Sequence, residues 1–518
     1  MFNMHVLAIS TLTILSCGVE ALPHPANSQQ YTGHYEPSTT SNPAAVTIPP
    51  AGTTPCNYGS RRPIDAPRAV NNTSLVRIRT AITHSTDYST PTISSHTLPS
   101  LHASLRLRQQ KWNGTQDLVP SALATAPSRV VSADTLDSIR GVNIGNWLIL
   151  EKWMDTDNLF SGDFANATDQ WSFDSIDGAA DRLISHWESY FTEEDVKKIA
   201  SWGINTLRIP IGYWAYNNSG TPFTTGSDAY LEKAISWARE SNLKVLIDCH
   251  GSPGSQNGYQ NSGHTGAVSW QTGDNLETSI TVLEFIAQKY GSAKYADVVM
   301  GLELVNEPIS WGPNNFNTTK RWAEKAYTAV RAASLNKDLV IVMHDSFMGP
   351  GQWQDVSEAI NSDTTDARAK FAIDAHFYQN QEDKDKTLTQ AQHIQDVCTW
   401  TQSTLRQPLS NMPVYIGELS AATDICVNPD GSTIGGTVCF IDGCQCSANL
   451  PIQYWGQNLI QATRQFFEAE LDAFERSSNG WFMWSYKGPG AWGLDNAVKY
   501  GLIGKTVSER MFPSQCNF

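Results

Sequence analysis

At 518 residues the chain is long enough for one α/β barrel of about 250 residues with insertions, and for a further segment besides. Its formal charge of −15 argues against nucleic acids and anionic membranes as partners, because polyanions are bound by basic patches. A neutral ligand fits this charge better. Seventeen tryptophans offer flat apolar faces of the kind on which sugar rings stack, although any single tryptophan is more often part of the core.

The N-terminal quarter of the chain is predicted to lie outside the folded domain. Residues 5–21 form an apolar run that is too short to span a bilayer and ends in small residues. We therefore expect a signal peptide over residues 1–21 and a secreted protein, extracellular or in the cell wall. Residues 22–134 are rich in Ser, Thr, Pro and Ala without an apolar period, and they predict a disordered or removable leader.

Sequons and cysteines agree with secretion. No stretch of the sequence after the signal reaches membrane-spanning length. The chain has nine cysteines, and setting aside Cys17 in the signal leaves eight, an even number that disulfides could pair. Zinc binding by Cys439, Cys444 and Cys446 is the alternative, but their spacing lacks paired C-x2-C units. The N-glycosylation sequons include Asn113, Asn166, Asn217 and Asn317.

From residue 135 to residue 518, short apolar runs alternate with segments of helical period, as expected of repeated βα units. One helix is marked by the capping pair Thr192 and Asp195 and by Gly203 as its stop. Eight runs are apolar over most of their length, as strands buried on both faces are, and they predict a (β/α)8 TIM barrel with long insertion loops. The runs centre on residues 141–144, 206–209, 244–248, 298–304, 339–343, 371–374, 414–417 and 481–484.

An open, doubly wound α/β sheet is the alternative fold. Such a sheet usually carries a glycine-rich phosphate loop after its first strand, and residues 141–145 lack the required glycine spacing.

In a (β/α)8 barrel the catalytic groups gather at the carboxyl ends of the strands. Several of the predicted strands end in, or are followed by, polar or aromatic residues. Each has a structural interpretation, as a buried ion-pair partner, a satisfied core histidine or a carboxylate near a helix start. One barrel mouth would collect all of them, which favours a functional interpretation. They are Arg208, His250, Asn306, Glu307, His376, Tyr378, Glu418 and Trp484.

Glu307 and Glu418 form the natural pair for glycoside hydrolysis, in which one carboxyl group protonates the leaving oxygen and the other attacks the anomeric carbon or activates water. Arg208 is expected to hold Glu418 ionised, and the charge of Glu418 is expected to raise the pKa of Glu307 so that it acts as an acid. Acetal cleavage needs neither a redox cofactor nor a metal, and the chain carries no nucleotide loop or HExxH cluster. We therefore expect no cofactor.

The order of these residues resembles the clan of retaining barrel glycosidases that contains glycoside hydrolase family 5. More narrowly, Arg140-Gly-Val-Asn-Ile-Gly-Asn-Trp147, Leu150-Glu151, the run from Asp248 to Gly258, and Gly417-Glu418 resemble the fungal exo-β-1,3-glucanases of that family. The resemblance covers about residues 139–516. It implies a retaining β-glucosidase that releases glucose from the non-reducing ends of β-1,3-glucan by double displacement. We expect a monomer.

Carried over residue by residue, the resemblance implies that Glu307 is the acid/base, that Glu418 is the nucleophile and that Asn306 binds the substrate 2-hydroxyl. Trp484 falls where the family places a stacking platform, and Arg208 joins the substrate-binding candidates. The remaining positions that match the family's glucose pocket are Glu151, His250, Asn261, His376 and Tyr378.

Two departures from the family pattern leave the glucan linkage open. The tyrosine often found just after the Leu-Glu of the first loop is Trp153, and the aromatic residue expected shortly after Tyr378 is replaced by the polar residues 379–382. The long loops 147–190 and 420–450 are expected to close one end of the cleft, which favours release of glucose from chain ends.

Within the enzyme class, an endo-β-1,6-glucanase, another β-glucosidase or a transglucosylase would share the same core. From another class, a non-catalytic carbohydrate-binding barrel is the alternative, against which the presence of both glutamates and Asn306 argues.

The resemblance also places a disulfide between Cys398 and Cys516. Cys426 is expected to pair with one of the three cysteines that follow it, clipping the loop after the strand of the nucleophile. Cys249 is expected to stay a buried thiol, because it lies in a strand beside His250.

Overall fold

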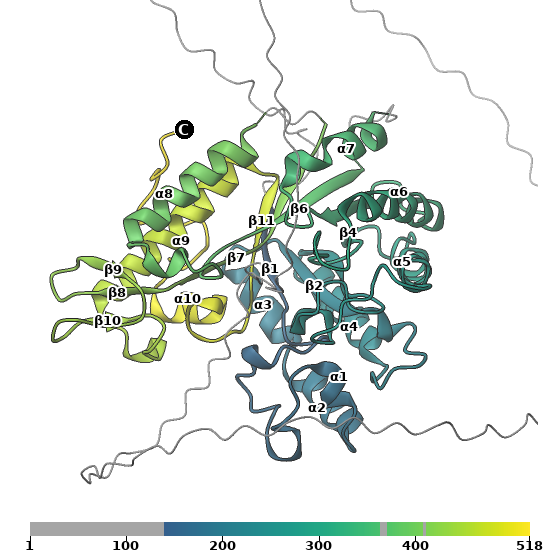
Figure 1. Ribbon diagram of the computed structural model, residues 1–518, viewed down its shortest axis with the longest axis horizontal. Coiled ribbons are helices and arrows are strands. Elements are labelled where there is room, and N and C mark those ends of the chain that lie inside the picture. The colour runs from purple at the N-terminus through teal and green to yellow at the C-terminus, as the bar shows by residue number, and fades with distance from the viewer. Residues whose placement is uncertain (1–138, 363–369, 408–410) are drawn as a thin grey trace, which may run out of the picture. The chain divides into compact units, whose positions relative to one another are not determined.

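The computed structural model describes residues 139–362, 370–407 and 411–518, and in it eight parallel strands close into a barrel (Figure 1). Each barrel strand pairs with the strands that precede and follow it in the barrel, and the last pairs with the first. The predicted (β/α)8 barrel is therefore confirmed, whereas the predicted signal peptide, the leader and Asn113 lie outside the described residues. The barrel strands are β1 (Ile139–Asn143), β2 (Thr206–Gly212), β3 (Lys244–Gly251), β4 (Val299–Glu303), β5 (Val340–His344), β6 (Phe371–Gln379), β7 (Val414–Thr423) and β11 (Gly480–Met483).

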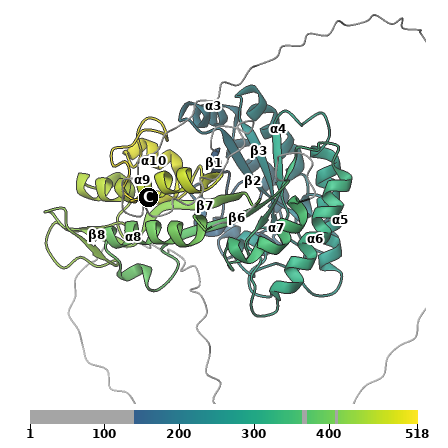
Figure 2. The same ribbon diagram turned by 90° about the horizontal axis from the view of Figure 1, so that it is seen from above.

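Helices between the strands cover the outside of the barrel (Figures 1 and 2). The predicted capping pair is confirmed, because Thr192 and Asp195 exchange side-chain and backbone hydrogen bonds at the start of α3. Within the described residues no helix combines the length and hydropathy needed to cross a bilayer. The helices are α1 (Gln170–Asp174), α2 (Ala179–Ser189), α3 (Glu193–Ser201), α4 (Ser227–Glu240), α5 (Asn275–Tyr290), α6 (Phe316–Ala333), α7 (Gln354–Asn361), α8 (Gln390–Trp400), α9 (Gln457–Ser477) and α10 (Leu494–Tyr500).

The lower part of the barrel interior is filled by an apolar cluster contributed by six different strands. Its packing is close: a Cβ atom added to Gly141 would lie 2.0 Å from the ring of Phe482, so only glycine fits there. The cluster consists of Ile139, Leu246, Val342, Ala372, Tyr415 and Phe482. It closes the barrel beneath the carboxyl ends of the strands.

Strands β6 and β7 run further than their apolar stretches predict. They stay paired as far as Gln379 and Thr423, and the register shifts between Ala375 and His376 and again before Gln379. His376, Tyr378 and Glu418 consequently lie within these extended strands and not in the loops that follow them. Bulges of this kind change the direction in which a side chain points.

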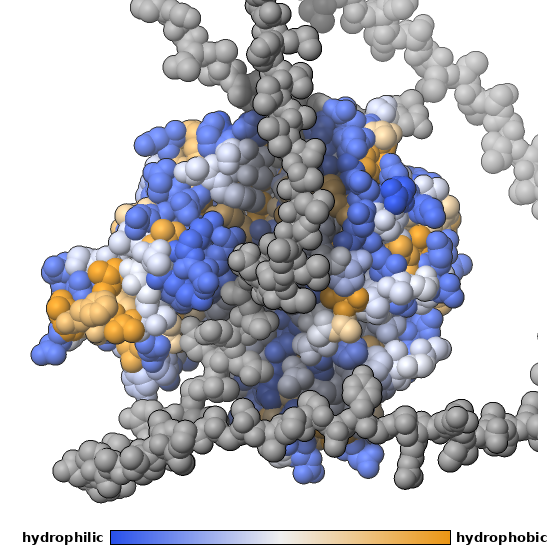
Figure 3. All heavy atoms as spheres, in the orientation of Figure 1, coloured by the Kyte–Doolittle hydropathy of each residue, from blue (hydrophilic) through white to orange (hydrophobic). Residues whose placement is uncertain are grey.

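The segment after β7 forms a small antiparallel sheet of β8 (Ile425–Val427), β9 (Thr433–Gly435) and β10 (Gln445–Cys446). Exposed apolar side chains gather on this part of the molecule, at the left of Figure 3. They include Val438, Phe440 and Ile441.

The cysteine predictions are confirmed. Cys398 pairs with Cys516, which ties α8 to the C-terminal segment, and Cys249 is a buried free thiol. Cys426 pairs with Cys446, one of its three predicted partners. The remaining two cysteines of the small sheet region, Cys439 and Cys444, are also bridged, although the four sulfur atoms of this region lie within 4.8 Å of one another, a spacing that would suit a metal ion as well.

Candidate active site

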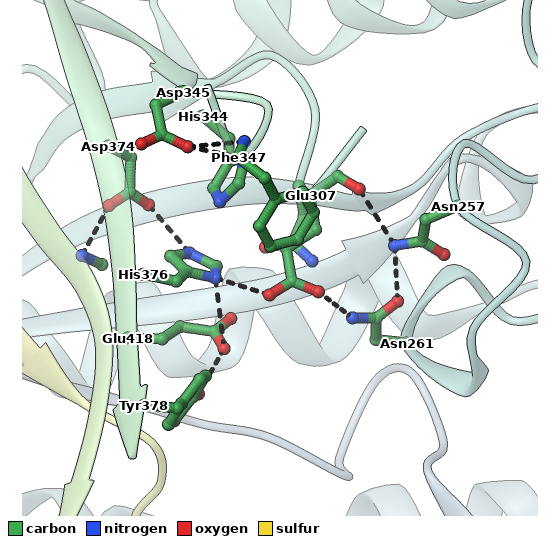
Figure 4. A network of polar contacts seen from close by, with 12 residues as sticks. Asn257, Asn261, Glu307, His344, Asp345, Phe347, Asp374, His376, Tyr378 and Glu418 are labelled. Atoms are coloured by element: carbon green, nitrogen blue, oxygen red, sulfur yellow. Dashed lines mark hydrogen bonds and ion pairs between the residues drawn. The ribbon is translucent and has the colours of Figure 1, made fainter. Parts of the chain in front are cut away.

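Glu418, in β7, carries a carboxylate that accepts two hydrogen bonds, and its contact with Tyr378 can be followed in Figure 4. Arg208 Nη1 donates to Oε1 over 3.1 Å, and the hydroxyl of Tyr378 donates to Oε2 over 2.6 Å. Burial raises the pKa of Glu418, although the nearby charges of His376 and Arg208 act in the opposite direction. The two donors fix the carboxylate in one orientation above the barrel interior.

Glu307 follows β4 and has a left-handed backbone conformation, with φ of 47°. Its Oε2 accepts a hydrogen bond of 2.5 Å from Asn261 Nδ2, and its Oε1 lies 2.8 Å from His376 Nδ1. Burial alone would raise the pKa of Glu307, but the hydrogen bond and charge of His376, with help from His250 and Asn261, lower it overall. Burial would likewise lower the pKa of His376, but its carboxylate neighbours, Glu418 first, raise it well above the usual value.

The expected order of the two carboxyl pKa values is therefore wrong in this structure. The sequence predicted a raised pKa for Glu307 and an ionised Glu418, whereas the pKa of Glu307 is lowered and that of Glu418 is raised. Burial raises the pKa of both carboxyl groups. For Glu307 it is outweighed by the hydrogen bond and charge of His376, whose Nδ1 is 2.8 Å away, whereas the charge of His376, 3.5 Å from Glu418 Oε2, does not outweigh burial there. Sequence spacing cannot reveal which carboxylate a histidine from another strand will contact.

Arg208 lies beneath the site and is fully buried. Its side-chain nitrogens are all engaged by other side chains, so it positions Glu418 from below. No nitrogen of the guanidinium is therefore without a side-chain partner. The partners of Arg208 are Asn143, Asp248, Glu303, Asn306, Asp374 and Glu418.

A group of aromatic and polar side chains lies beside the two carboxylates. The ring of His250 stacks on Trp484 with 5.3 Å between ring centroids and 6° between planes, and His250 Nδ1 is 2.5 Å from Asp248 Oδ2. Glu151, in the loop after β1, accepts a hydrogen bond of 2.8 Å from Trp153 Nε1. Burial raises the pKa of Glu151 to about 7.

Several buried polar atoms at this mouth have no hydrogen-bond partner among the described residues. They include Glu151 Oε1, His250 Nε2 and Asn306 Nδ2, and also Asp248 Oδ1, Glu303 Oε1 and His344 Nε2. Buried polar atoms are nearly always hydrogen-bonded in folded proteins, so each such exception needs an explanation. The atoms of Glu151, His250 and Asn306 belong to residues that the sequence assigned to substrate binding, and together they could donate to and accept from a polyhydroxylated ligand.

The ten candidate residues from the sequence thus meet in one site, linked by the contacts described above. Sequence reasoning missed the layer below them, including Asp374, whose Oδ2 lies 3.3 Å from His376 Nε2. A signal was present, because Asp248 precedes His250 by two residues and Asp374 precedes His376 by two, and such pairs face the same side of a strand. Trp492 was also missed; it packs against both Trp153 and Tyr378.

Two overlapping sets of side chains in this mouth have the spacing of metal ligands, Glu307 with His344 and His376, and Glu303 with Asp374 and His376. Both sets contain His376, whose two ring nitrogens already face Glu307 and Asp374. Arg208 brings its positive charge to Glu303 and Asp374. Side chains of both sets are therefore already engaged by neighbouring charged groups.

Known proteins resemble this chain in sequence and in fold. A sequence model of the cellulase family, glycosyl hydrolase family 5, matches residues 169–434. The chain is 35% identical over 393 residues to glucan 1,3-beta-glucosidase 1 of Schizosaccharomyces pombe, which covers 74% of this chain and 91% of that protein. The chain belongs to glycosyl hydrolase family 5. This family 5 chain is also 34% identical over 415 residues to probable glucan 1,3-beta-glucosidase A of Emericella nidulans, covering 77% of this chain and 98% of that protein.

Among solved structures, the rutinosidase from Aspergillus niger resembles this family 5 chain with a TM-score of 0.56 at 20% identity, covering 70% of this chain and 97% of that one. At this identity the likeness supports the barrel fold. Family membership confirms the predicted resemblance and makes the protein a glycoside hydrolase, as expected from the paired glutamates.

Proposed function

We propose that this family 5 hydrolase is a retaining glucan 1,3-β-glucosidase, with Glu307 as acid/base and Glu418 as nucleophile. The observation that carries the proposal is that Glu151, His250 and Asn306 hold unpartnered polar atoms beside two carboxylates, which suits a sugar ring held next to an acid/base and a nucleophile. The relatives named as glucan 1,3-beta-glucosidases match over most of their length and support β-1,3-glucan as the substrate.

The separation of the two carboxylates supports a retaining mechanism. His376 Nδ1 is 2.8 Å from Glu307 Oε1 and 3.5 Å from Glu418 Oε2, so these two oxygens lie no further apart than the sum of the two distances. Inverting enzymes typically hold their carboxyl groups about 6.5–9.5 Å apart to leave room for a water, whereas retaining enzymes hold them at roughly 5–5.5 Å.

In the first step Glu418 attacks the anomeric carbon while Glu307 gives a proton to the departing glycosidic oxygen. Because His376 and Glu307 share a hydrogen bond, the proton that Glu307 passes to the leaving oxygen can come from the histidine, which leaves Glu307 ionised for the second step. In the second step Glu307 takes a proton from water, which then displaces Glu418 and releases β-glucose. Asn306 Nδ2 would donate to the sugar 2-hydroxyl, and Trp484 would stack on the ring.

The proposal extends to the rest of the chain. A signal peptide over residues 1–21, a leader over 22–134 and a catalytic domain over 135–518 would deliver a secreted monomer to glucan outside the cell. The sequons at Asn166, Asn217 and Asn317 would then carry glycans.

Analysis of the first products from two glucans tests the proposal. From laminarin, a β-1,3-glucan, we expect single glucose units from the outset, formed as the β-anomer. Long oligosaccharides appearing first would show endo action in an open cleft, and preferential cleavage of pustulan, a β-1,6-glucan, would replace the proposal with a β-1,6-glucanase.

A further inference from the structure

His344 is a buried histidine that neither chemical step described above uses. It ends β5, is fully buried, and packs edge-on against His376 with 4.3 Å between the ring centroids. His376 in turn contacts Glu307, so His344 lies on the acid/base side of the site (Figure 4). A ring nitrogen of His344, a ring nitrogen of His376 and a carboxylate oxygen of Glu307 all lie within 4.8 Å of one another.

The backbone fixes which nitrogen of His344 carries the proton. The N–H of Ser346 donates to Nδ1 over 3.0 Å, so Nδ1 has to be an acceptor without a proton of its own. Burial, together with the charges of His376 and Arg208, lowers the pKa of His344 well below its usual value, so the ring is neutral. A neutral ring with a bare Nδ1 carries its proton on Nε2. Nε2 is therefore a hydrogen-bond donor and not a metal ligand.

This donor has no acceptor among the residues that the structure describes. An unsatisfied buried donor is costly, and buried waters commonly bond to such groups. Two polar groups about 4–5 Å apart are typically bridged by one water, because each of its hydrogen bonds spans roughly 2.7–3 Å. His344 lies too far from Glu307 for a direct hydrogen bond from Nε2, but close enough for such a bridge.

We propose that His344 is a positioning residue that orients the attacking water of the second step. This inference rests on the proposed function. A water that accepts the Nε2–H of His344 and donates one hydrogen to Glu307 keeps its second lone pair for attack on the anomeric carbon. As Glu307 takes that proton, the bond from the water oxygen to the anomeric carbon forms. The bond from this carbon to Glu418 breaks, and its electron pair returns to the Glu418 carboxylate.

The burial of His344 has a consequence for the choice of acceptor. Because the ring is fully buried, the position between it and Glu307 suits a molecule as small as water but not a sugar. A sugar that accepts the glucosyl group has to approach Glu307 from the open side of the mouth, without help from Nε2. His344 therefore favours hydrolysis over transfer to sugars.

A dinitrophenyl β-glucoside separates the two steps, because its leaving group departs without a proton and hydrolysis of the glycosyl-enzyme then limits kcat. His344→Gln and His344→Met form a matched pair, since both side chains reach about as far as Nε2 but only glutamine carries an N–H there. For His344→Met we expect kcat to fall about tenfold with kcat/KM unchanged, so that KM falls with kcat, because only the step that uses water loses a hydrogen bond. His344→Gln should recover most of kcat.

Partition between water and a sugar acceptor gives a second readout. With phenyl β-thioglucoside as the acceptor, whose sulfur link resists cleavage, the ratio of transfer product to glucose should rise about tenfold in His344→Met. His393→Met is the control, because His393 is also fully buried with an Nε2 that lacks a partner among the described residues, but it lies on the outer helix α8. Its partition should equal that of the wild type. His344→Phe, which keeps a flat ring, replaces His344→Met if that variant does not fold.

An unchanged kcat and partition in His344→Met would overturn the inference. So would an equal fall of kcat and kcat/KM, which would indicate general damage to the site, or a glutamine variant as slow as the methionine variant. A wild-type enzyme that releases no glucose from the dinitrophenyl glucoside would instead overturn the proposed function, and this inference with it.

Discussion

Two layers of side chains fill the barrel, and they differ completely in chemistry although the same strands supply both. The lower layer is the apolar cluster that includes Leu246 and Ala372. Two residues further along the same two strands stand Asp248 and Asp374, both of which face Arg208. Because a step of two residues keeps a side chain on the same face of a strand, the interior changes from apolar to charged within one step.

The two layers are stable for different reasons. The lower layer gains from removing apolar surface from water, and each of its members contributes separately. The upper layer places one buried cation among several carboxylates, an arrangement that is stable only as a set, since removing one partner leaves the others as unpaired buried charges. The lower layer therefore supports the fold, while the upper layer sets the charge and orientation of the reacting groups.

Of the substitutions that distinguish the two layers, Arg208→Met should change stability and activity most. Methionine keeps an apolar side chain of comparable length but leaves Asp248 and Glu418 without their cation. We expect the free energy of unfolding to fall by about 3–5 kcal/mol at neutral pH and turnover of an aryl β-glucoside to be lost. The loss of stability should shrink in acid, where the carboxyl groups protonate. Urea denaturation at pH 7 and pH 4 measures it, and a variant as stable and active as the wild type would refute the role of the charged layer.

Phe482→Ala tests the apolar layer. The ring is fully buried, and its removal leaves a cavity that should lower the free energy of unfolding by about 3–4 kcal/mol. In contrast to Arg208→Met, the loss should not depend on pH, and the folded variant should hydrolyse the aryl glucoside at close to the wild-type rate. Loss of activity without loss of stability would contradict the separation of the two layers.

Glu151→Gln should change the free energy of unfolding less, and should increase it. Burial raises the pKa of Glu151 from 4.5 to about 7, so the folded state binds the proton more tightly than the unfolded state. Stability therefore falls as pH rises from 4.5 to 7, and the full penalty remains at higher pH. Glutamine cannot ionise, so the variant should be more stable than the wild type by about 2–3 kcal/mol at pH 8 and equally stable at pH 4. A difference that does not vary with pH would show that Glu151 does not titrate in this range.

Much of the barrel and its mouth could be predicted because the relevant signals are local. The apolar run of residues 244–248 marks a buried strand, and His250 follows it where a barrel places its functional residues. The same reasoning brought Glu307 and Glu418 to one place without any knowledge of distances. Family resemblance added Asn261, which lies in a loop with no local signal and which the structure places 2.5 Å from Glu307.

Other features depend on contacts between segments far apart in the chain. Strands β6 and β7 continue past their register shifts because they pair with each other. The apolar runs alone therefore predicted strands that were too short. The order of the carboxyl pKa values depends on how close His376 lies to each glutamate. The contact between His344 and His376 likewise exists only because β5 and β6 are neighbours.

The roles of the two glutamates can be tested most directly by azide rescue with a dinitrophenyl β-glucoside. Its leaving group departs without a proton, so Glu307→Ala should still form the glycosyl-enzyme and stall at hydrolysis, where the base is missing. Azide needs no base and should rescue this variant with β-glucosyl azide as the product. In Glu418→Ala azide would enter the face left by the nucleophile and give the α-anomer. Reversed anomers would exchange the two roles, and full laminarin activity in either variant would contradict the site.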